Sequence, residues 1–419
     1  MTETITILEN KRILLGVTGS IAVYKAVDLA SKLTQAGAQV DVIMTEAAQR
    51  FVTPLAFQSV TGRPVYTSLW GEGGEGLPTH IAHVGLGEGA DLLVIAPCTA
   101  NTLARLAHGH ADDLLSVTAL AARCPLVIAP AMDGGMYSQE VVQFNLRIVQ
   151  GRGALLIEPE EGRFASGLVG KGRLPETPTL IGHIRRALGR DGALKGRKVV
   201  VTAGGTREPI DPVRYISNRS SGKQGYALAQ AALDAGASKV TLISAARDLP
   251  APVGASLIPV GSAAEMLYAV LGQTADADVL LMAAAVADFT LPDVATHKIK
   301  KQEDRDEAPV LVLARTPDIL MAIKNRRAES GRPRVVVGFA AESQDLLANA
   351  QSKLARKGVD LLVANDITAP DAGFEVDTNR IVILDAAGGQ EALELMTKTR
   401  AAEQIVARVA ALLSVEDGN

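Results

Sequence analysis

The chain has 419 residues, a formal net charge of −4 and 47% hydrophobic residues. A slightly acidic chain of this composition is not typical of a nucleic-acid binder, and no uninterrupted apolar segment of about 18 residues predicts a membrane span. Cys98 and Cys124 lack CxxC spacing, and the N-terminal segment lacks the apolar core of a signal peptide, so we expect free thiols in a cytoplasmic protein.

The first half of the chain alternates strands and helices. Strands are predicted over residues 12–17, 40–44, 91–96 and 126–129, and a helix over residues 21–36. This alternation predicts a parallel, doubly wound sheet whose ligands bind beyond the carboxyl ends of the strands.

A polar, glycine-bearing segment at residues 187–197 separates this half from the next strand. We therefore expect two domains, at residues 1–190 and 191–419, in agreement with the typical domain size of about 100–200 residues. The second domain repeats the scheme, with strands predicted near residues 198–203, 239–243, 279–284, 334–338, 360–364 and 380–384 and a closing helix near 399–413.

A long polar loop at residues 206–225 connects the strand at 198–203 to an alanine-rich helix. Such connections normally have about 2–6 residues, so the length itself predicts a site. The loop carries several cations, and its glycines lie next to a helix N-terminus, where N–H groups attract phosphate. These features predict an anionic ligand, although Gln224 after Lys223 excludes a Walker A loop.

Three motifs follow strands of the first half: a small-residue turn at 16–22, PCTANT at 97–102 and PAMDGGMY at 130–137. The turn is not a GxGxxG fingerprint, but its N–H groups can hold a single phosphate. All three motifs fall where a doubly wound sheet binds ligands.

Together with further motifs at residues 283–289, 298–301, 338–342 and 364–366, nearly the whole chain resembles the bifunctional phosphopantothenoylcysteine decarboxylases and phosphopantothenate–cysteine ligases of bacterial coenzyme A biosynthesis. The resemblance implies an α/β fold of two doubly wound, Rossmann-like, three-layer domains, the first of them flavodoxin-like. It also implies that cysteine is ligated to 4′-phosphopantothenate with CTP, through an acyl-cytidylate. FMN-dependent decarboxylation to 4′-phosphopantetheine would follow.

In the first domain the resemblance implies FMN contacts at Gly19, Ser20, Ile21, Thr45, Thr99, Asn101 and Met132. It implies catalysis by His83, with His80 as the competing candidate, because histidine moves protons most readily near neutral pH. Arg173 is expected to bind substrate.

The chain departs from the family at Asp133, where the family has asparagine, and at Ser166, where it has a cysteine that donates a proton. Both residues are still expected to act in catalysis, with a protonated Asp133 donating a hydrogen bond to the substrate carboxylate. The alternatives are an active ligase fused to a regulatory flavoprotein domain that has lost the reaction, and another FMN enzyme, such as a flavin prenyltransferase, fused to a nucleotide-binding domain.

In the second domain the resemblance implies that Lys298 forms the acyl-cytidylate, that Asn218 converts it to product and that Arg214 binds substrate. Asp288 is expected to contact Mg²⁺ bound with CTP. The implied nucleotide-binding residues are Ala283, Ala284, Asp288, Lys298, Thr316, Pro317, Asp318, Ile319, Phe339, Lys353 and Lys357.

The partners implied by the resemblance are the small-molecule substrates and further copies of the same chain. Decarboxylase trimers linked through ligase dimers would give a dodecamer. No nucleic acid or membrane partner is expected.

Overall fold

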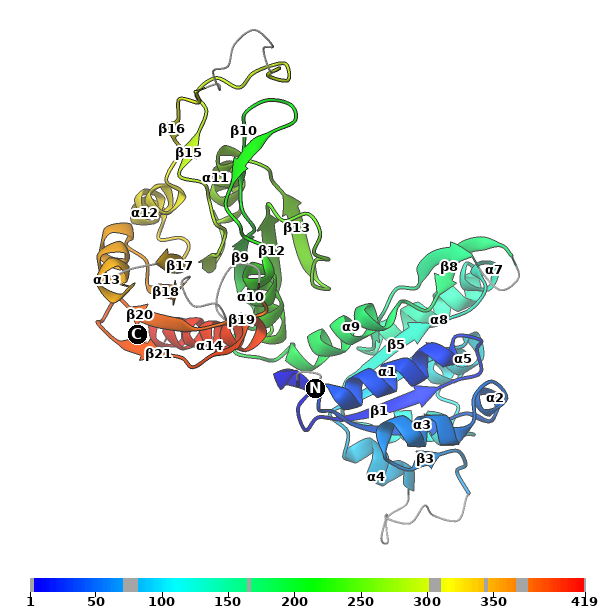
Figure 1. The fold of residues 1–419 in the computed structure, drawn as a ribbon. Helices are drawn as coiled ribbons and strands as arrows, with labels where there is room; N and C mark the ends of the chain where they lie inside the picture. Colours follow the sequence, from blue (N-terminus) through cyan, green and yellow to red (C-terminus); the bar gives the residue numbers. More distant parts are fainter. Residues whose placement is uncertain are drawn as a thin grey trace. The chain divides into compact units, whose positions relative to one another are not determined.

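The computed structural model describes residues 4–70, 82–163, 167–300, 310–342, 346–366 and 376–417. The chain forms two compact units, residues 1–189 and 190–419 (Figure 1). No helix in the described part of the chain combines the length and the apolar character that a membrane span needs.

The first unit is built on a six-stranded parallel sheet in the order β3-β2-β1-β4-β5-β6. Its strands are β1 (Arg12–Val17), β2 (Gln39–Met44), β3 (Val65–Tyr66), β4 (Leu92–Cys98), β5 (Leu126–Pro130) and β6 (Leu155–Leu156). The order reverses between β1 and β4, which makes this pair the topological switch point of the sheet.

Helices cover both faces of this sheet because alternate strand residues point to opposite sides. Ile13, Leu15 and Val17 pack with α1 (Val23–Gln35), α3 (Pro54–Thr61) and α9 (Thr177–Gly189). The opposite face packs with α4 (Ala82–Glu88), α5 (Ala100–His108), α6 (Leu114–Ala121) and α8 (Glu140–Gly151). Smaller elements complete the unit: the 3-10 helix at Thr6–Leu8, α2 (Glu46–Gln49), α7 (Gly134–Tyr137) and the antiparallel pair β7 (Glu160–Arg163) and β8 (Val169–Arg173).

The second unit has an eight-stranded sheet in the order β13-β12-β9-β14-β17-β18-β20-β21. Its switch point lies between β9 and β14. The strands are β9 (Lys198–Ala203), β12 (Lys239–Ser244), β13 (Ala255–Pro259), β14 (Val279–Met282), β17 (Val335–Glu342), β18 (Leu361–Asp366), β20 (Ile381–Asp385) and β21 (Gln390–Ala392).

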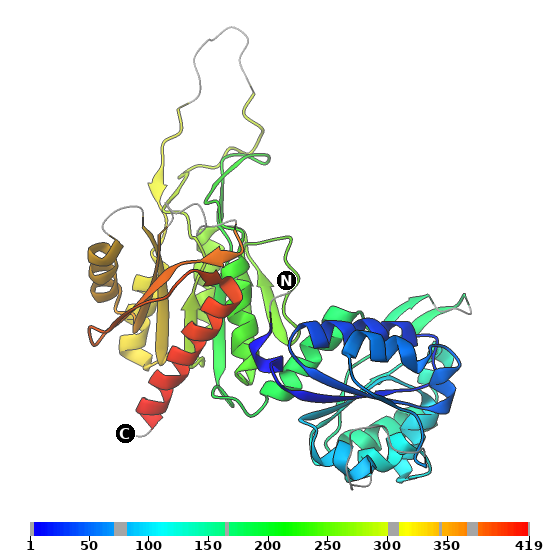
Figure 2. The ribbon, with the colours of Figure 1, turned by 60° about the horizontal axis from the view of Figure 1, so that its bottom comes forward.

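One face of this sheet is covered by α10 (Lys223–Asp234) and α14 (Lys398–Asp417), which pack against each other as well. The other face is covered by α11 (Ala263–Gln273), α12 (Ile319–Ser330) and α13 (Leu346–Lys357). The short pairs are β10 (Arg207–Pro209) with β11 (Tyr215–Ser217), β15 (Phe289–Thr290) with β16 (Ala314–Arg315), and β19 (Thr378–Asn379) with β22 (Met396–Thr397). Both views show β10 and the chain around β15 and β16 extending from the same end of the second unit (Figures 1 and 2).

The predicted fold class is confirmed, and each strand predicted from the sequence is present within a few residues of its expected bounds. The second unit differs from the expected repeat of a parallel sheet at one edge. There β20 runs antiparallel to β18, and β21 runs antiparallel to β20. The tight turn between β20 and β21 contains Gly388 at φ +93°, which reverses the chain without a crossover helix.

Candidate functional site

The switch point of the first unit is held together by Thr18, which follows β1. Its Oγ1 donates a hydrogen bond to the carbonyl oxygen of Pro97 at 2.7 Å and accepts one from the N–H of Thr99 at 3.0 Å. Thr18 is buried, so these bonds fix the turn after β1 against the segment after β4. The two segments that carry predicted flavin-binding residues therefore lie side by side at the switch point.

The turn after β1 also lies directly against α2. A Cβ on Gly19 would be only 2.5 Å from the Cβ of Ala47, so glycine is required for this approach. The N–H of Thr45 donates to the carbonyl oxygen of Val17 at 3.0 Å. Thr45, the predicted flavin contact after β2, thus lies beside the same turn.

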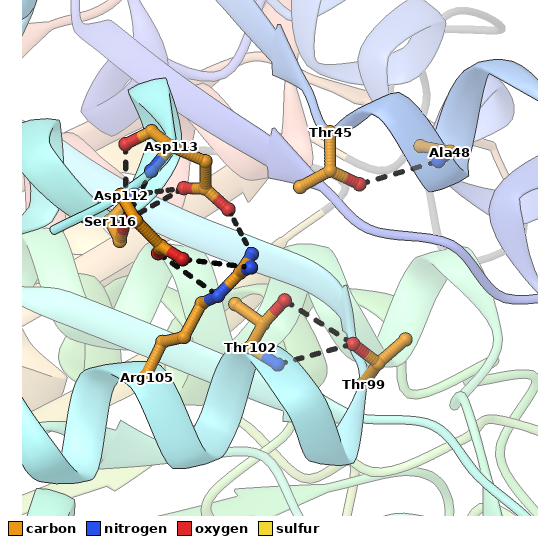
Figure 3. Close-up of polar contacts among 8 residues, drawn as sticks. All are labelled: Thr45, Ala48, Thr99, Thr102, Arg105, Asp112, Asp113 and Ser116. Carbon is orange, nitrogen blue, oxygen red and sulfur yellow. Dashed lines mark hydrogen bonds and ion pairs between the residues drawn. The ribbon is translucent and has the colours of Figure 1, made fainter. Parts of the chain in front are cut away.

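Threonine side chains begin two of the helices at this edge (Figure 3). The Oγ1 of Thr45 accepts from the N–H of Ala48 at 3.3 Å, and the Oγ1 of Thr99 accepts from the N–H of Thr102 at 3.4 Å. By contrast, α1 begins after Ala22, whose side chain has no oxygen to cap the helix. The N–H groups of Val23 and Lys25 in the first turn of α1 donate instead to the carbonyl oxygens of Ser20 and Ala22, each at 3.0 Å.

Arg105 on α5 links this helix to the loop before α6 (Figure 3). Its Nη1 lies 2.5 Å from Oδ2 of Asp113 and its Nε lies 3.1 Å from Oδ1 of Asp112. Asp113 also forms a capping box with Ser116 at the start of α6. The sequence patterns did not reveal this network; a capping residue ahead of an apolar run was its one local signal.

Asp133, which replaces the expected asparagine, begins α7. Its Oδ1 accepts from the N–H of Gly135 at 2.9 Å. Asparagine could make the same cap through its amide oxygen, because both residues are favoured at this position. The substitution therefore preserves the local backbone and replaces an amide group by a carboxyl group.

A cavity of about 620 Å³ lies beside Asp133 and is also lined by Tyr137, Gln143, Leu168 and Lys171. The carbonyl oxygen of Gly172 accepts from the N–H of Met132 at 3.0 Å, which fastens β8 to the end of β5. The predicted residues Met132 and Asp133 are thus brought together with β8.

Sequence reasoning missed a polar cluster at this cavity. Lys171 Nζ and the hydroxyl of Tyr137 both donate to Oε2 of Glu158, at 2.6 Å and 3.2 Å. Burial and the Glu158 carboxylate raise the pKa of Tyr137 above its usual value, so this hydroxyl stays protonated. No local motif joins these three positions, since α7, the segment after β6 and β8 meet only in the folded unit.

The remaining predicted residues of the first unit are spread over other elements. His83 is half-buried in α4. Arg173 ends β8, with its Nη2 3.9 Å from Oε1 of Glu176. Ser166 and the alternative histidine, His80, lie outside the described residues.

The switch point of the second unit is joined by two buried threonines. Thr202 Oγ1 accepts from the N–H of Ala284 at 3.0 Å, and Thr206 Oγ1 accepts from the N–H of Ala287 at 2.9 Å. The segment after β14, which carries the predicted Ala283 and Ala284, is thereby fixed against the long loop after β9.

Asn218 in that loop is oriented by the same segment. Its Nδ2 lies 3.2 Å from the carbonyl oxygens of both Ala285 and Val286, to which it donates. The loop backbone is close enough that a Cβ on Gly205 would be 2.6 Å from the carbonyl oxygen of Asn218. Gly205 therefore serves this close approach, whereas Gly204 serves another, because its Cβ would lie 2.5 Å from the backbone nitrogen of Ala246.

A cavity of about 1240 Å³ opens at this switch point. Within the part of the chain that the structure describes, Lys298 is the one predicted nucleotide-binding residue that does not line it. Its lining includes Asn218, Ala283, Ala284, Asp288, Thr316, Pro317, Asp318, Ile319, Phe339, Lys353 and Lys357.

Both predicted lysines of this cavity bond to other groups of the protein. Lys353 Nζ donates to the carbonyl oxygen of Phe339 at 2.9 Å, and Lys357 pairs with Asp318, which caps α12. Burial alone would raise the pKa of Asp318, but hydrogen bonds from Lys357 and the N–H of Met321 hold it below its usual value. An anionic ligand would compete with Asp318 for Lys357.

Two further lysines line the same cavity, one at the start of α10 and the other at the start of α14. Lys223 Nζ lies 2.6 Å from Oδ1 of Asp377, and the buried Lys398 donates to the carbonyl oxygen of Val376 at 2.5 Å. Burial, together with the charge of Lys223, lowers the pKa of Lys398. Lys398 carried no motif signal, because it reaches the cavity from the beginning of the last helix.

Arg214, which is predicted to bind substrate, forms hydrogen bonds with other groups of the protein. Its Nε and Nη2 donate to Oδ2 of Asp211 at 3.0 Å and 2.5 Å, and Nη2 also donates to the carbonyl oxygen of Ile299 at 2.8 Å. The exposed Lys298 directly precedes Ile299. The structure thus places Arg214 beside the Lys298 segment rather than in the lining of the cavity.

Among the described residues, no group of three or more histidine, cysteine, aspartate or glutamate side chains could hold a metal ion. Each unit is a doubly wound α/β domain, a fold whose ligands bind at the switch point of the sheet. A protein with two such domains belongs to the class with two separate small-molecule sites.

Two protein-family models match the chain: Flavoprotein over residues 1–189 and DNA/pantothenate metabolism flavoprotein C-terminal domain over residues 194–413. The coenzyme A biosynthesis bifunctional protein CoaBC of Bacillus subtilis is 46% identical over 408 residues, which cover 97% of this chain and 98% of that protein. CoaBC of Mycolicibacterium smegmatis is 44% identical over 418 residues, covering 97% of this chain and 99% of that protein.

Solved structures match each unit separately. The C-terminal domain of a coenzyme A biosynthesis bifunctional protein CoaBC is 34% identical, with a TM-score of 0.45, and covers 54% of this chain and 99% of that chain. The FMN-dependent cysteine decarboxylase SpaF is 37% identical, with a TM-score of 0.35, and covers 39% of this chain and 91% of that chain.

The chain belongs to the CoaBC family of bifunctional coenzyme A biosynthesis proteins. It is a bifunctional enzyme that combines a flavoprotein decarboxylase domain with a ligase domain, as the sequence predicts.

Proposed function

We propose that the crevice between β1 and β4 binds FMN for decarboxylation of 4′-phosphopantothenoylcysteine. The cavity between β9 and β14 would bind CTP and 4′-phosphopantothenate for ligation to cysteine. The observation that carries this proposal is the cavity of about 1240 Å³, because its lining gathers residues from segments that are far apart in the sequence. We assign the two activities to residues 1–190 and 191–419.

The FMN assignment is supported by the chemistry of the first crevice. Gly19 lets the turn after β1 approach α2 closely, and the turn leads into the N-terminus of α1, the kind of position where phosphates bind. When bound, FMN supplies the electron sink that loss of CO2 from a cysteinyl carboxylate requires. Gly19, Ser20, Ile21, Thr45, Thr99, Asn101 and Met132 would hold it.

In the decarboxylase step we assign substrate binding to the cavity beside Asp133. A protonated Asp133 would donate to the substrate carboxylate, and Lys171 in the same cavity adds a positive charge. His83, Ser166 and Arg173 remain proposed catalytic and substrate-binding residues.

In the ligase step, Lys353 and Lys357 would bind the nucleotide and Lys298 would stabilise charge on the phosphates while the acyl-cytidylate forms. Asn218 would hold the acyl group as the amine of cysteine displaces CMP. Mg²⁺ typically binds through one or two carboxylates together with substrate phosphates. Asp288 suits this arrangement because it lines the cavity.

We further propose that the chain assembles into oligomers, with ligase dimers linking decarboxylase trimers. Exposed apolar side chains gather on the part of the second unit that carries β10, β11, β15 and β16. They are Val213, Tyr215, Phe289, Val310 and Val312. A second copy that covered them would remove apolar surface from water. Light scattering of the purified chain would test the stoichiometry.

The ligase proposal is tested by following pyrophosphate release from CTP by the full chain with 4′-phosphopantothenate, cysteine and Mg²⁺. Lys298→Gln should abolish this release, because its amide carries no positive charge. Lys300→Gln is the matched control, since Lys300 is exposed in the same segment, and it should retain turnover. Near-native turnover of a folded Lys298→Gln protein would contradict the assigned role.

The decarboxylase proposal is tested by CO2 release from 4′-phosphopantothenoylcysteine by the FMN-loaded chain. Release of CO2 supports an active first domain despite Asp133 and Ser166. An FMN-loaded chain that ligates but releases no CO2 would instead identify the first domain as a regulatory flavoprotein.

A further inference from the structure

The segment that carries Lys298 is fastened to the turn between β10 and β11. The N–H of Ala295 donates to the carbonyl oxygen of Ile210 at 3.1 Å. Further along, the N–H of Ile299 donates to Oδ2 of Asp211 at 3.2 Å, and its carbonyl oxygen accepts from Nη2 of Arg214 at 2.8 Å. A single ion pair therefore holds both backbone polar groups of the residue that follows Lys298.

This ion pair is itself rigid. The Asp211 side chain is 0% exposed, and its Oδ1 accepts from the N–H groups of Val213 and Arg214, each at 2.8 Å. Its Oδ2 accepts from the Arg214 side chain and from Ile299. The hydrogen bonds from the Arg214 side chain and the backbone hold the pKa of Asp211 far below its usual value, against the effect of burial. The carboxylate is thus ionised, and its bonds to these donors are charge-assisted.

Regular secondary structure does not fix the backbone at Lys298 within the described residues of this segment. Residues 291–300 form neither helix nor strand, and a lysine side chain is long and freely rotating. The position of its ammonium group therefore depends on how firmly the backbone beside it is held.

We propose that Asp211 and Arg214 are positioning residues for Lys298. They act through their two hydrogen bonds to the backbone of Ile299. We name this ion pair the Asp211–Arg214 clamp. This inference rests on the proposed role of Lys298 in forming the acyl-cytidylate. Arg214, which the sequence analysis expects to bind substrate, would instead act indirectly: together with Asp211 it would position Lys298.

The first test measures pyrophosphate release by full-length Asp211→Asn and Arg214→Met. Both variants should lose about 100-fold in turnover at saturating substrate, the scale of a misplaced catalytic group. The KM for 4′-phosphopantothenate should change little in either. A KM increase confined to Arg214→Met would overturn the clamp in favour of substrate binding by Arg214.

The second test reports the position of residue 298 without using activity. A nitroxide spin label is attached to Lys298→Cys in a Cys124→Ser background; the other cysteine, Cys98, is fully buried, and burial raises its pKa to about 12. Adding Asp211→Asn should increase the mobility of the label in its paramagnetic resonance spectrum. An unchanged spectrum would overturn the clamp.

Asp278→Asn is the matched control for both tests. Asp278 is also buried, and it likewise accepts from a backbone N–H, that of Lys198 at 2.9 Å, and from an arginine, Arg332 at 2.6 Å. It lies at the start of β14, at the opposite end of that strand from the cavity. Asp278→Asn should leave turnover and label mobility unchanged; if it matches Asp211→Asn in both, the effect is general destabilisation and the clamp is overturned.

The two proposals fail separately. Normal turnover of Lys298→Gln would contradict the ligase role of Lys298, whereas the label experiment would still decide whether the clamp holds this segment.

Discussion

The two units reverse strand order in the same way, but different kinds of residue lie at their switch points. In the first, Thr18 joins a short turn to the segment after β4 through uncharged groups. In the second, the end of the long loop lines a cavity, and so do Lys223, Lys353, Lys357 and Lys398. The same scaffold thus provides a close-fitting backbone in one unit and a cationic cavity in the other.

This difference matches the ligands that we propose. FMN carries one phosphate and a large planar ring, so a glycine turn and a helix N-terminus suffice for its anionic end. CTP brings several phosphate charges, which call for cations as well as N–H groups. Variants that alter only one crevice can therefore separate the two activities.

The largest effect is expected from Gly205→Ala. Its Cβ would lie 2.6 Å from the carbonyl oxygen of Asn218, so the loop must move, and ligase turnover should fall about 100-fold. Flavin content should be unchanged. Gly272→Ala is the control in the same unit because a Cβ there meets no atom within 4 Å. A fall in flavin content would break the proposed separation.

Gly19→Ala should produce the converse result. The new methyl group would crowd Ala47, at 2.5 Å from its Cβ, and overpacking of this kind costs about 1–3 kcal/mol. We expect flavin affinity to fall about tenfold or more, measured by flavin absorbance during titration, with normal ligase turnover. Gly151→Ala, which adds a Cβ in open space, should bind flavin normally; equal affinities for the two variants would refute the assigned crevice.

Thr18→Val should have a smaller effect, mainly on stability. It removes both bonds that join the segments after β1 and β4 and leaves buried backbone groups unpaired, which costs about 1–3 kcal/mol. The measurement is unfolding in urea, monitored through the release of flavin. Thr34→Val is the comparison, because the Thr34 hydroxyl bonds only to its own helix, at the carbonyl oxygen of Ala30. Equal losses would mean that the interstrand bonds of Thr18 contribute nothing.

The smallest effect concerns pH. Because the folded pKa of Asp211 is depressed, its ionised form contributes stability above the unfolded pKa of about 3.9, and this contribution is lost as the pH falls. The stability difference between the native chain and Asp211→Asn should therefore be constant near neutrality and shrink below about pH 4. Unfolding of the second unit can be followed by circular dichroism. A difference that widens on acidification would contradict the assigned ionisation.

Much of the fold could be predicted from the sequence because the central strands are long apolar runs. The strands β1, β9 and β14 are examples, since both faces of each are buried. The short edge strand β3 and the β7–β8 pair escaped prediction, because their partners, rather than local apolar patterns, define them. The strand β20 was predicted, but its antiparallel direction is defined by its pairing with β18.

The sequence by itself determined the two doubly wound units, the family and most of the candidate crevice residues, because motifs and strand periodicity are local. Only the tertiary structure decided that Lys398 lines the cavity of the second unit, that Glu158 joins Tyr137 and Lys171, and that Arg214 holds Ile299. Each of these contacts joins segments separated along the chain. Their hydrogen bonds depend on distances of about 3 Å, which strand order and loop packing establish and no single segment encodes.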